Sequence, residues 1–318
     1  MGFKNMLPQK SAALRALSAT LVCFSITSAP AVAQSSGQQT AVIVPAQFVE
    51  DAGASQRVDF AGKLRMLSQR VVAAGCAYQA GILPEQSGAV LQAATAEFAL
   101  ILDALVNGND DLGIIGAEER RKTLYGMNKL RELWEPMSAV TTGIAPNDGN
   151  IDAVADLATQ SGPVLEMAKV MVSEISGQYA NQAELLQSDA LAIDVAGRQR
   201  MLSQRMSKNV CLVGSGINVD AAKAELAATA QVFETSLIAL RDAMVQAGIN
   251  PPPNDAIYEG LTVVVGDWDR LKPIVEATIA GGSIDSEQRE IMFSGANQMT
   301  GNMNKVVGMY SEASKLGL

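Results

Sequence analysis

Two arginines, Arg65 and Arg200, occupy equivalent places in a repeated motif and carry the clearest chemical signal in the sequence. The stretch Asp59-Phe-Ala-Gly-Lys-Leu-Arg-Met-Leu-Ser-Gln-Arg70 returns 135 residues later as Asp194-Val-Ala-Gly-Arg-Gln-Arg-Met-Leu-Ser-Gln-Arg205. A guanidinium is a planar fork of hydrogen-bond donors that matches the geometry of an oxyanion. Two such groups brought together would favour the binding of a small anion.

The composition excludes several kinds of site. The 318 residues contain no histidine, so Ser-His and Cys-His catalytic centres and histidine-ligated metals are ruled out. The net charge of −9 argues against binding to nucleic acid, which normally needs a basic surface. No combination of nucleophile and base can be assembled from the motifs. We therefore expect a protein that is not an enzyme and that uses neither a cofactor nor a metal.

The N-terminal region has the three parts of a secretory signal. A basic stretch is followed by an apolar run over residues 16–26 and by the small residues Ala31-Val-Ala33. The alternative is an uncleaved membrane anchor, but the run is far shorter than the ~20 residues that span a bilayer, and no other segment is expected to reach that length. We expect cleavage after residue 33, which leaves a soluble periplasmic protein that begins with a linker over residues 34–54.

The similarity between the two copies extends well beyond the motif. Phe98, for example, matches Phe233 at the same spacing of 135 residues. Self-similarity over this length indicates a duplicated structural unit. The sequence therefore predicts two modules, residues 55–185 and 190–318.

Each module is predicted to be a bundle of four helices. Apolar residues recur at i, i+3 and i+4, and the composition is rich in Ala, Leu, Met and Gln. Asp285 and Gln288 have the spacing of a capping box that opens the last helix. Short loops favour an up-down topology, so the predicted fold class is all-α, with two tandem four-helix up-down bundles that form a pseudo-dimer. The breaks between helices fall at residues 81–85, 108–116 and 146–149 in the first module and at 214–218, 248–254 and 281–282 in the second.

The side of each motif helix that carries the arginine is small and neutral-polar. A solvent-exposed side would carry Glu and Lys, and a core side would carry Leu and Ile. Because Gly and Ala let two backbones come close, we predict that these two sides, here called the seam, pack against each other. Serine and glutamine can form hydrogen bonds across such a contact, so Ser68, Gln69, Ser203 and Gln204 are expected to support it. The seam also contains Ala61, Gly62, Val72 and Cys76 in the first copy and Ala196, Gly197, Ser207 and Cys211 in the second.

The motif also carries acidic residues, which need an interpretation of their own. Asp59 and Lys63, like Asp194 and Arg198, are i,i+4 pairs in the favourable order of acid before base, and we interpret them as surface ion pairs. The alternative to anion binding at the two motif arginines is a salt bridge to a carboxylate elsewhere in the bundle. Anion binding is favoured because neither copy of the seam contains an acid.

The string at residues 196–205 resembles the N-terminal sensory domain of type IV pili methyl-accepting chemotaxis transducers (the PilJ type). It is similar, more loosely, to the periplasmic domains of nitrate/nitrite sensor kinases. The resemblance implies a four-helix bundle that dimerises through its first helix, with nitrate held between the motif helices by Arg65 and Arg200, near Gly62 and Gly197. Relatives carry flanking membrane helices and a signalling region that this sequence lacks, so we expect that the chain does not itself pass a signal across a membrane.

Elementary electrostatics agrees with this implication. Two guanidiniums about 7 Å apart repel each other by roughly 2 kcal/mol at an effective dielectric constant of 20. A planar oxyanion between them replaces the repulsion with charge-assisted hydrogen bonds. We therefore expect a periplasmic protein that binds one nitrate or nitrite per chain, without dimerisation, and serves a membrane transporter or sensor. The alternative function is a structural scaffold at the cell envelope, with no small-molecule ligand.

Two questions stay open at the level of sequence. Cys76 and Cys211 lie on the seam three turns beyond their arginines, so they are either a disulfide, which an exported protein would keep, or two buried thiols. The disulfide needs Cα atoms about 4.4–6.8 Å apart, closer than most helix pairs allow, and this slightly favours free thiols. Residues 174–194 are either one continuous helix, which would keep the motif helices apart, or contain a turn near Ser176-Gly177, which would let them pair side by side.

Overall fold

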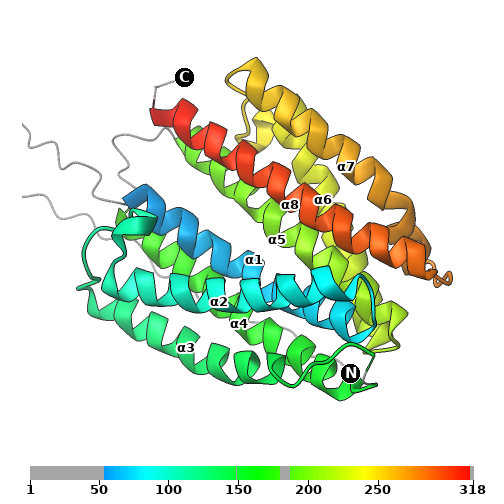
Figure 1. Ribbon diagram of the computed structural model, residues 1–318. Helices are drawn as coiled ribbons and strands as arrows, with labels where there is room; N and C mark the ends of the chain where they lie inside the picture. The colour runs from blue at the N-terminus through cyan, green and yellow to red at the C-terminus, as the bar shows by residue number, and fades with distance from the viewer. Residues whose placement is uncertain (1–53, 148, 180–186, 316–318) are drawn as a thin grey trace, which may run out of the picture. The chain divides into compact units, whose positions relative to one another are not determined.

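The computed structural model describes residues 54–147, 149–179 and 187–315, and this part of the chain folds into α-helices joined by short loops (Figure 1). The expected signal sequence, residues 1–33, and all but the last residue of the expected linker lie outside the described residues. The first four helices are α1 (Ala54–Gln79), α2 (Pro84–Asn107), α3 (Arg121–Thr141) and α4 (Ile151–Tyr179). The last four are α5 (Gln187–Gly214), α6 (Val219–Asp242), α7 (Asp255–Ile279) and α8 (Ser286–Lys315).

Each set of four helices forms a bundle with the same neighbours. Helix α1 packs against α2 and α4, and α3 closes the bundle by packing against the same two helices. The second set repeats this arrangement, with α5 against α6 and α8 and with α7 closing the bundle. The prediction of two tandem four-helix bundles is confirmed. Both bundles belong to one compact unit that extends from Val49 to Leu318.

The cores of the two bundles are built on the repeat. In the first bundle the rings of Phe98 and Trp134 stack with their centroids 3.8 Å apart, and in the second Phe233 and Trp268 meet at 5.2 Å in a tilted arrangement. All four side chains are buried, and each pair links the second helix of its bundle to the third. Equivalent aromatic residues therefore pack between the second and third helices in both cores.

The helix boundaries follow local signals in the sequence. The predicted capping box at the start of α8 is confirmed, because the backbone N–H of Gln288 donates to Oδ1 of Asp285 (2.8 Å) and the backbone N–H of Asp285 donates to Oε1 of Gln288 (3.1 Å). The loop after α1 turns at Gly81 and the loop after α5 turns at Gly216, both with positive φ angles that glycine adopts without strain. Three loops in each module therefore fall where the sequence predicts breaks.

The two bundles meet through the motif helices α1 and α5, which lie side by side (Figure 1). Helix α4 runs on through Ser176 and Gly177 to Tyr179, so the turn suggested there is wrong. The connection to α5 falls within residues 180–186, outside the described residues. Of the two arrangements left open by the sequence, the structure has the side-by-side pairing of the motif helices.

One expectation about apolar segments is also wrong. Within the described residues, α2 is the one helix that is long and apolar enough to cross a membrane, whereas the sequence interpretation found no such segment. The apolar content has a simpler cause, because α2 supplies Phe98, Ile101, Leu102 and Leu105 to the core of the first bundle. Its outer side is made largely of alanines together with the exposed Leu100, and these residues raise the hydropathy further.

Candidate anion-binding site

The seam between α1 and α5 buries both motif arginines. Ala61 and Ala196 are fully buried where the two helices pack together, and the small side chains allow this close approach. Arg65 and Arg200 retain only 7% and 3% of their exposure, which is unusual for a residue that is almost always charged. A buried guanidinium must be paired, and the surroundings of these two decide what the site can do.

The two guanidiniums converge over the two motif glycines. A Cβ atom on Gly62 would lie 3.6 Å from Nη2 of Arg65 and 3.6 Å from Nη2 of Arg200. A Cβ atom on Gly197 would lie 3.5 Å from Nη2 of Arg200 and 4.0 Å from that of Arg65. A methyl group at either position would touch both guanidiniums and fill the space that a shared ligand needs. The structure therefore brings together all four residues that the sequence proposes as ligand-binding.

The arginines have carboxylate partners, which corrects the sequence interpretation. Nη2 of Arg200 lies 2.9 Å from Oδ1 of Asp59, and both Nη atoms of Arg65 lie 3.4 Å from Oδ1 of Asp194. Each arginine thus reaches across the seam to the aspartate of the other module. Helical side chains lean toward the N-terminus of their helix, so a long arginine reaches the level of a residue six positions earlier on its neighbour. The spacing of residues within one helix does not show these partners, because they lie on the neighbouring helix.

The same aspartates also contact cations on their own helices, as the sequence predicts. Nζ of Lys63 lies 3.8 Å from Asp59, and Nη2 of Arg198 lies 2.5 Å from Asp194. The six connected charges are therefore four cations and two carboxylates, with a net charge of +2. Burial lowers the pKa of Arg65, the cations Arg198 and Arg200 lower it further, and Asp194 raises it. The cluster carries more positive charge than it can neutralise internally.

The two arginines differ in their further contacts. Nη1 of Arg200 donates to Oδ1 of Asn304 on α8 at 2.7 Å, and its Nε lies 3.4 Å from the carbonyl oxygen of Gly197. For Arg65, Asp194 is the only acceptor among the described residues, at a distance where hydrogen bonds are weak. Sequence reasoning missed Asn304, because it lies 104 residues from Arg200 on another helix and no spacing links the two.

The expected supporting residues bond elsewhere than across the seam. Ser68 and Ser203 donate to carbonyl oxygens on their own helices, those of Arg65 and Gln199. Gln69 donates to Ser68 at 3.2 Å, and Gln204 donates to Thr300 on α8 at 2.8 Å. These four side chains are fully buried, and of their hydrogen bonds only those of Gln204 link a motif helix to another helix of its bundle. The polar side-chain contacts across the seam are instead the crossed arginine–aspartate pairs.

The cysteines form a disulfide in the structure. Cys76 and Cys211 are bonded, with their Cα atoms 6.1 Å apart. The prediction that slightly favoured free thiols is wrong: it used the usual separation of helix pairs, whereas the small Gly and Ala residues of this seam permit α1 and α5 to lie closer than that. The disulfide joins equivalent residues at one level, and the crossed arginine–aspartate pairs join equivalent residues at another, so the two motif helices run parallel and in register.

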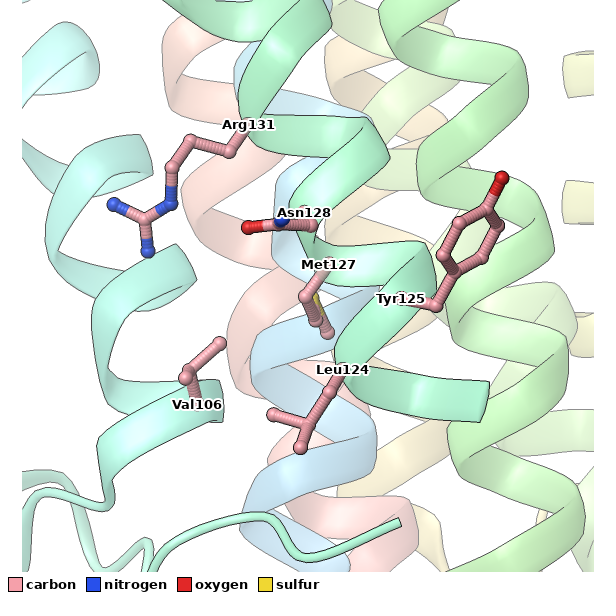
Figure 2. A pocket seen from close by; sticks show the side chains of 6 residues that line it. All are labelled: Val106, Leu124, Tyr125, Met127, Asn128 and Arg131. Atoms are coloured by element: carbon pink, nitrogen blue, oxygen red, sulfur yellow. The ribbon is translucent and has the colours of Figure 1, made fainter. Parts of the chain in front are cut away.

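Other features of the described residues do not add to this site. No group of three or more Cys, Asp or Glu side chains in the described part of the chain is arranged to hold a metal ion. A pocket of about 310 Å³ lies between α2 and α3 and is lined by Val106, Leu124, Met127 and Arg131, among others. Figure 2 shows the Arg131 guanidinium directed toward α2, while Tyr125 points to the other side of α3. Neither motif arginine lines this pocket.

Comparison with protein families identifies the repeat. Residues 49–159 and residues 183–292 each match the profile of the family described as the type IV pili methyl-accepting chemotaxis transducer N-terminal domain (PilJ). Together the two ranges cover more than half of the chain, and each contains one copy of the motif. Comparisons with curated proteins and with solved structures give no match.

Proposed function

Because the chain belongs to the family of type IV pili methyl-accepting chemotaxis transducer N-terminal domains, in two tandem copies, we propose that it is an exported sensory protein that binds one small oxyanion, nitrate or nitrite. The ligand lies between Arg65 and Arg200, over Gly62 and Gly197. The protein is not an enzyme, and it reports or delivers the anion to a membrane transporter or sensor. Family membership supports the sensory role.

The convergence of two buried guanidiniums on paired glycines is the observation that carries this proposal. Both Nη2 atoms lie within 4.0 Å of the same two Cβ positions, so one small ligand can reach both. The surplus charge of +2 favours an anion, and a planar anion accepts hydrogen bonds from both forks. Nitrate and nitrite are weakly hydrated and therefore lose little on entering such a narrow contact.

The duplication sets the expected stoichiometry. In a dimer of single modules, one ligand on the two-fold axis would contact two identical arginines. Here both arginines belong to one chain, and the disulfide keeps the motif helices together. Binding of one anion per chain, independent of protein concentration, follows from this arrangement.

Calorimetric titration tests the proposal, with nitrate, nitrite, sulfate and chloride as ligands. Arg65→Ala and Arg200→Ala should each weaken binding by about 1.5–3 kcal/mol, which is the free energy that a hydrogen bond to a charged group contributes. Arg131→Ala on α3 removes the same charge away from the seam and is the matched control. Equal affinity in the wild type and in the Arg65→Ala, Arg200→Ala double variant would reject the site.

A scaffold without a small ligand is the second candidate, and one observation favours it. Each motif arginine already has a carboxylate partner, so the crossed pairs can act as a purely structural link between modules. Under this function no anion produces heat in the titration. The arginine variants then lose stability but no binding activity.

A further inference from the structure

We infer that Asp59 and Asp194 are internal competitors of the anion: each occupies the arginine of the opposite module, and the ligand binds by displacing them. The inference rests on the proposed function and describes how that site is regulated. It assigns to the two aspartates a role beyond that of surface ion pairs. Binding thereby exchanges two contacts between the modules for two contacts to the ligand.

The crossed arrangement makes the aspartates equivalent to a built-in ligand. Asp59 on α1 accepts from Arg200 on α5, and Asp194 on α5 accepts from Arg65 on α1. A carboxylate and a nitrate present similar planar oxygen acceptors to a guanidinium. The same Nη2 atoms that converge over the glycines also contact the aspartates, so an anion at the glycines and the two aspartates draw on the same donor groups.

The unequal burial of the partners favours displacement of the aspartates. The side chains of Arg65 and Arg200 are 9% and 3% exposed, whereas those of Asp194 and Asp59 are 34% and 38% exposed. A released aspartate can turn into water and keep its contact with the cation on its own helix, Arg198 or Lys63. A buried guanidinium without a partner is unfavourable because it has lost its hydration. The incoming anion restores a charged hydrogen-bond partner.

The two competitors should differ in strength. The contact of Arg200 with Asp59 is short and is reinforced by Asn304, whereas Arg65 reaches Asp194 only at 3.4 Å. Arg65 is therefore the arginine that is released more easily, and Asp59 is the stronger competitor. Removing the charge of Asp59 should improve anion binding more than removing the charge of Asp194.

Asp59→Asn and Asp194→Asn, singly and together, test this inference by titration with nitrate and nitrite. The double variant should bind about tenfold more tightly, the factor expected if the arginines are free of their aspartates in about one molecule in ten. Asp156→Asn on α4 and Asp269→Asn on α7 are exposed controls that remove the same charge elsewhere, and they should leave the affinity unchanged. Thermal unfolding with and without nitrate gives a second reading, since the nitrate-induced rise in Tm should be larger in the double variant.

The possible results separate the inference from the proposed function. Tighter binding in the variants, or binding seen only in the double variant, supports competition by the aspartates. Unchanged or weaker binding in the variants, with normal binding in the wild type, overturns the inference and leaves the proposed function standing. Absence of binding in the wild type and in every aspartate variant overturns both. A double-mutant cycle of Asp59 and Arg200 without anion checks the pairing itself, and a coupling of zero overturns the inference.

Discussion

The two bundles share a motif and a helix order, yet their interiors differ in polarity. Position 64 in α1 is a buried leucine, and the equivalent position 199 in α5 is a fully buried glutamine. Neither the Nε2 nor the Oε1 atom of Gln199 has a hydrogen-bond partner among the described residues. An unsatisfied buried amide costs stability. At this position the second bundle therefore tolerates a cost that the first avoids.

A partly buried charge network in the second bundle adds to this difference. Ala73 and Ala74 of α1 correspond to Lys208 and Asn209 of α5, both of which are buried. Nζ of Lys208 lies 2.7 Å from Oε2 of Glu225 on α6, and Nδ2 of Asn209 donates to the same oxygen at 2.9 Å. The seam residues, in contrast, are nearly the same in both copies. The duplicated modules have diverged inside while they keep a common contact surface, which is what a shared site on that surface requires.

Separating the bundles should have the largest effect. Cys76→Ala with Cys211→Ala opens a loop of 135 residues and should lower the free energy of unfolding by about 5 kcal/mol. Without the link, the more polar second bundle should unfold at a lower denaturant concentration than the first. Each bundle contains one of the two tryptophans, so Trp134→Phe and Trp268→Phe backgrounds report the second and the first bundle separately by fluorescence. A single transition at the wild-type midpoint in both backgrounds would contradict the prediction.

Breaking the charge network should destabilise the second bundle by a smaller amount. Glu225→Ala leaves the buried Lys208 without its carboxylate and should cost about 3 kcal/mol in chemical denaturation. The matched control is Val90→Ala, the equivalent position of the first bundle, with an expected cost of about 1 kcal/mol. Equal losses at the two positions would show that the network contributes nothing beyond packing.

The same network predicts a pH dependence. Burial raises the pKa of Glu225, but Lys208, Asn209 and Arg205 together lower it by more, so the pKa in the folded protein lies below 4.5. The ion pair therefore contributes stability above about pH 4.5, and this contribution is lost as the pH falls through the folded pKa. The free energy of unfolding should fall more steeply in acid for the wild type than for Glu225→Gln.

Making the second interior resemble the first should have the smallest effect. Gln199→Leu replaces an unsatisfied amide with the side chain found at position 64 and should stabilise the protein by about 1 kcal/mol. The reciprocal change Leu64→Gln should destabilise it, because a second unsatisfied amide is then buried. Denaturation midpoints of the two variants measure both effects. Destabilisation by Gln199→Leu would mean that the amide has a partner, such as an internal water.

The sequence by itself determines much of this protein. Helical periodicity predicts every long element, the repeat predicts two bundles, and the small residues around Arg65 and Arg200 predict a helix contact with a cation at its centre. These features depend on residues close in the chain or on comparison of one copy with the other. The family likewise follows from the motif, and the comparison with protein families agrees.

Only the tertiary structure decides which groups face each other across the contact. Periodicity assigns a residue to one side of a helix, but it does not say which level of the neighbouring helix that residue reaches. The crossed pairs of Arg65 with Asp194 and of Arg200 with Asp59 depend on the parallel register of α1 and α5 and on the length of the arginine side chain. Asn304 comes from α8, and its place beside Arg200 depends on how the second bundle closes. The disulfide depends on a backbone separation that only the packed seam sets, because the small residues permit a close approach but do not by themselves bring two helices together.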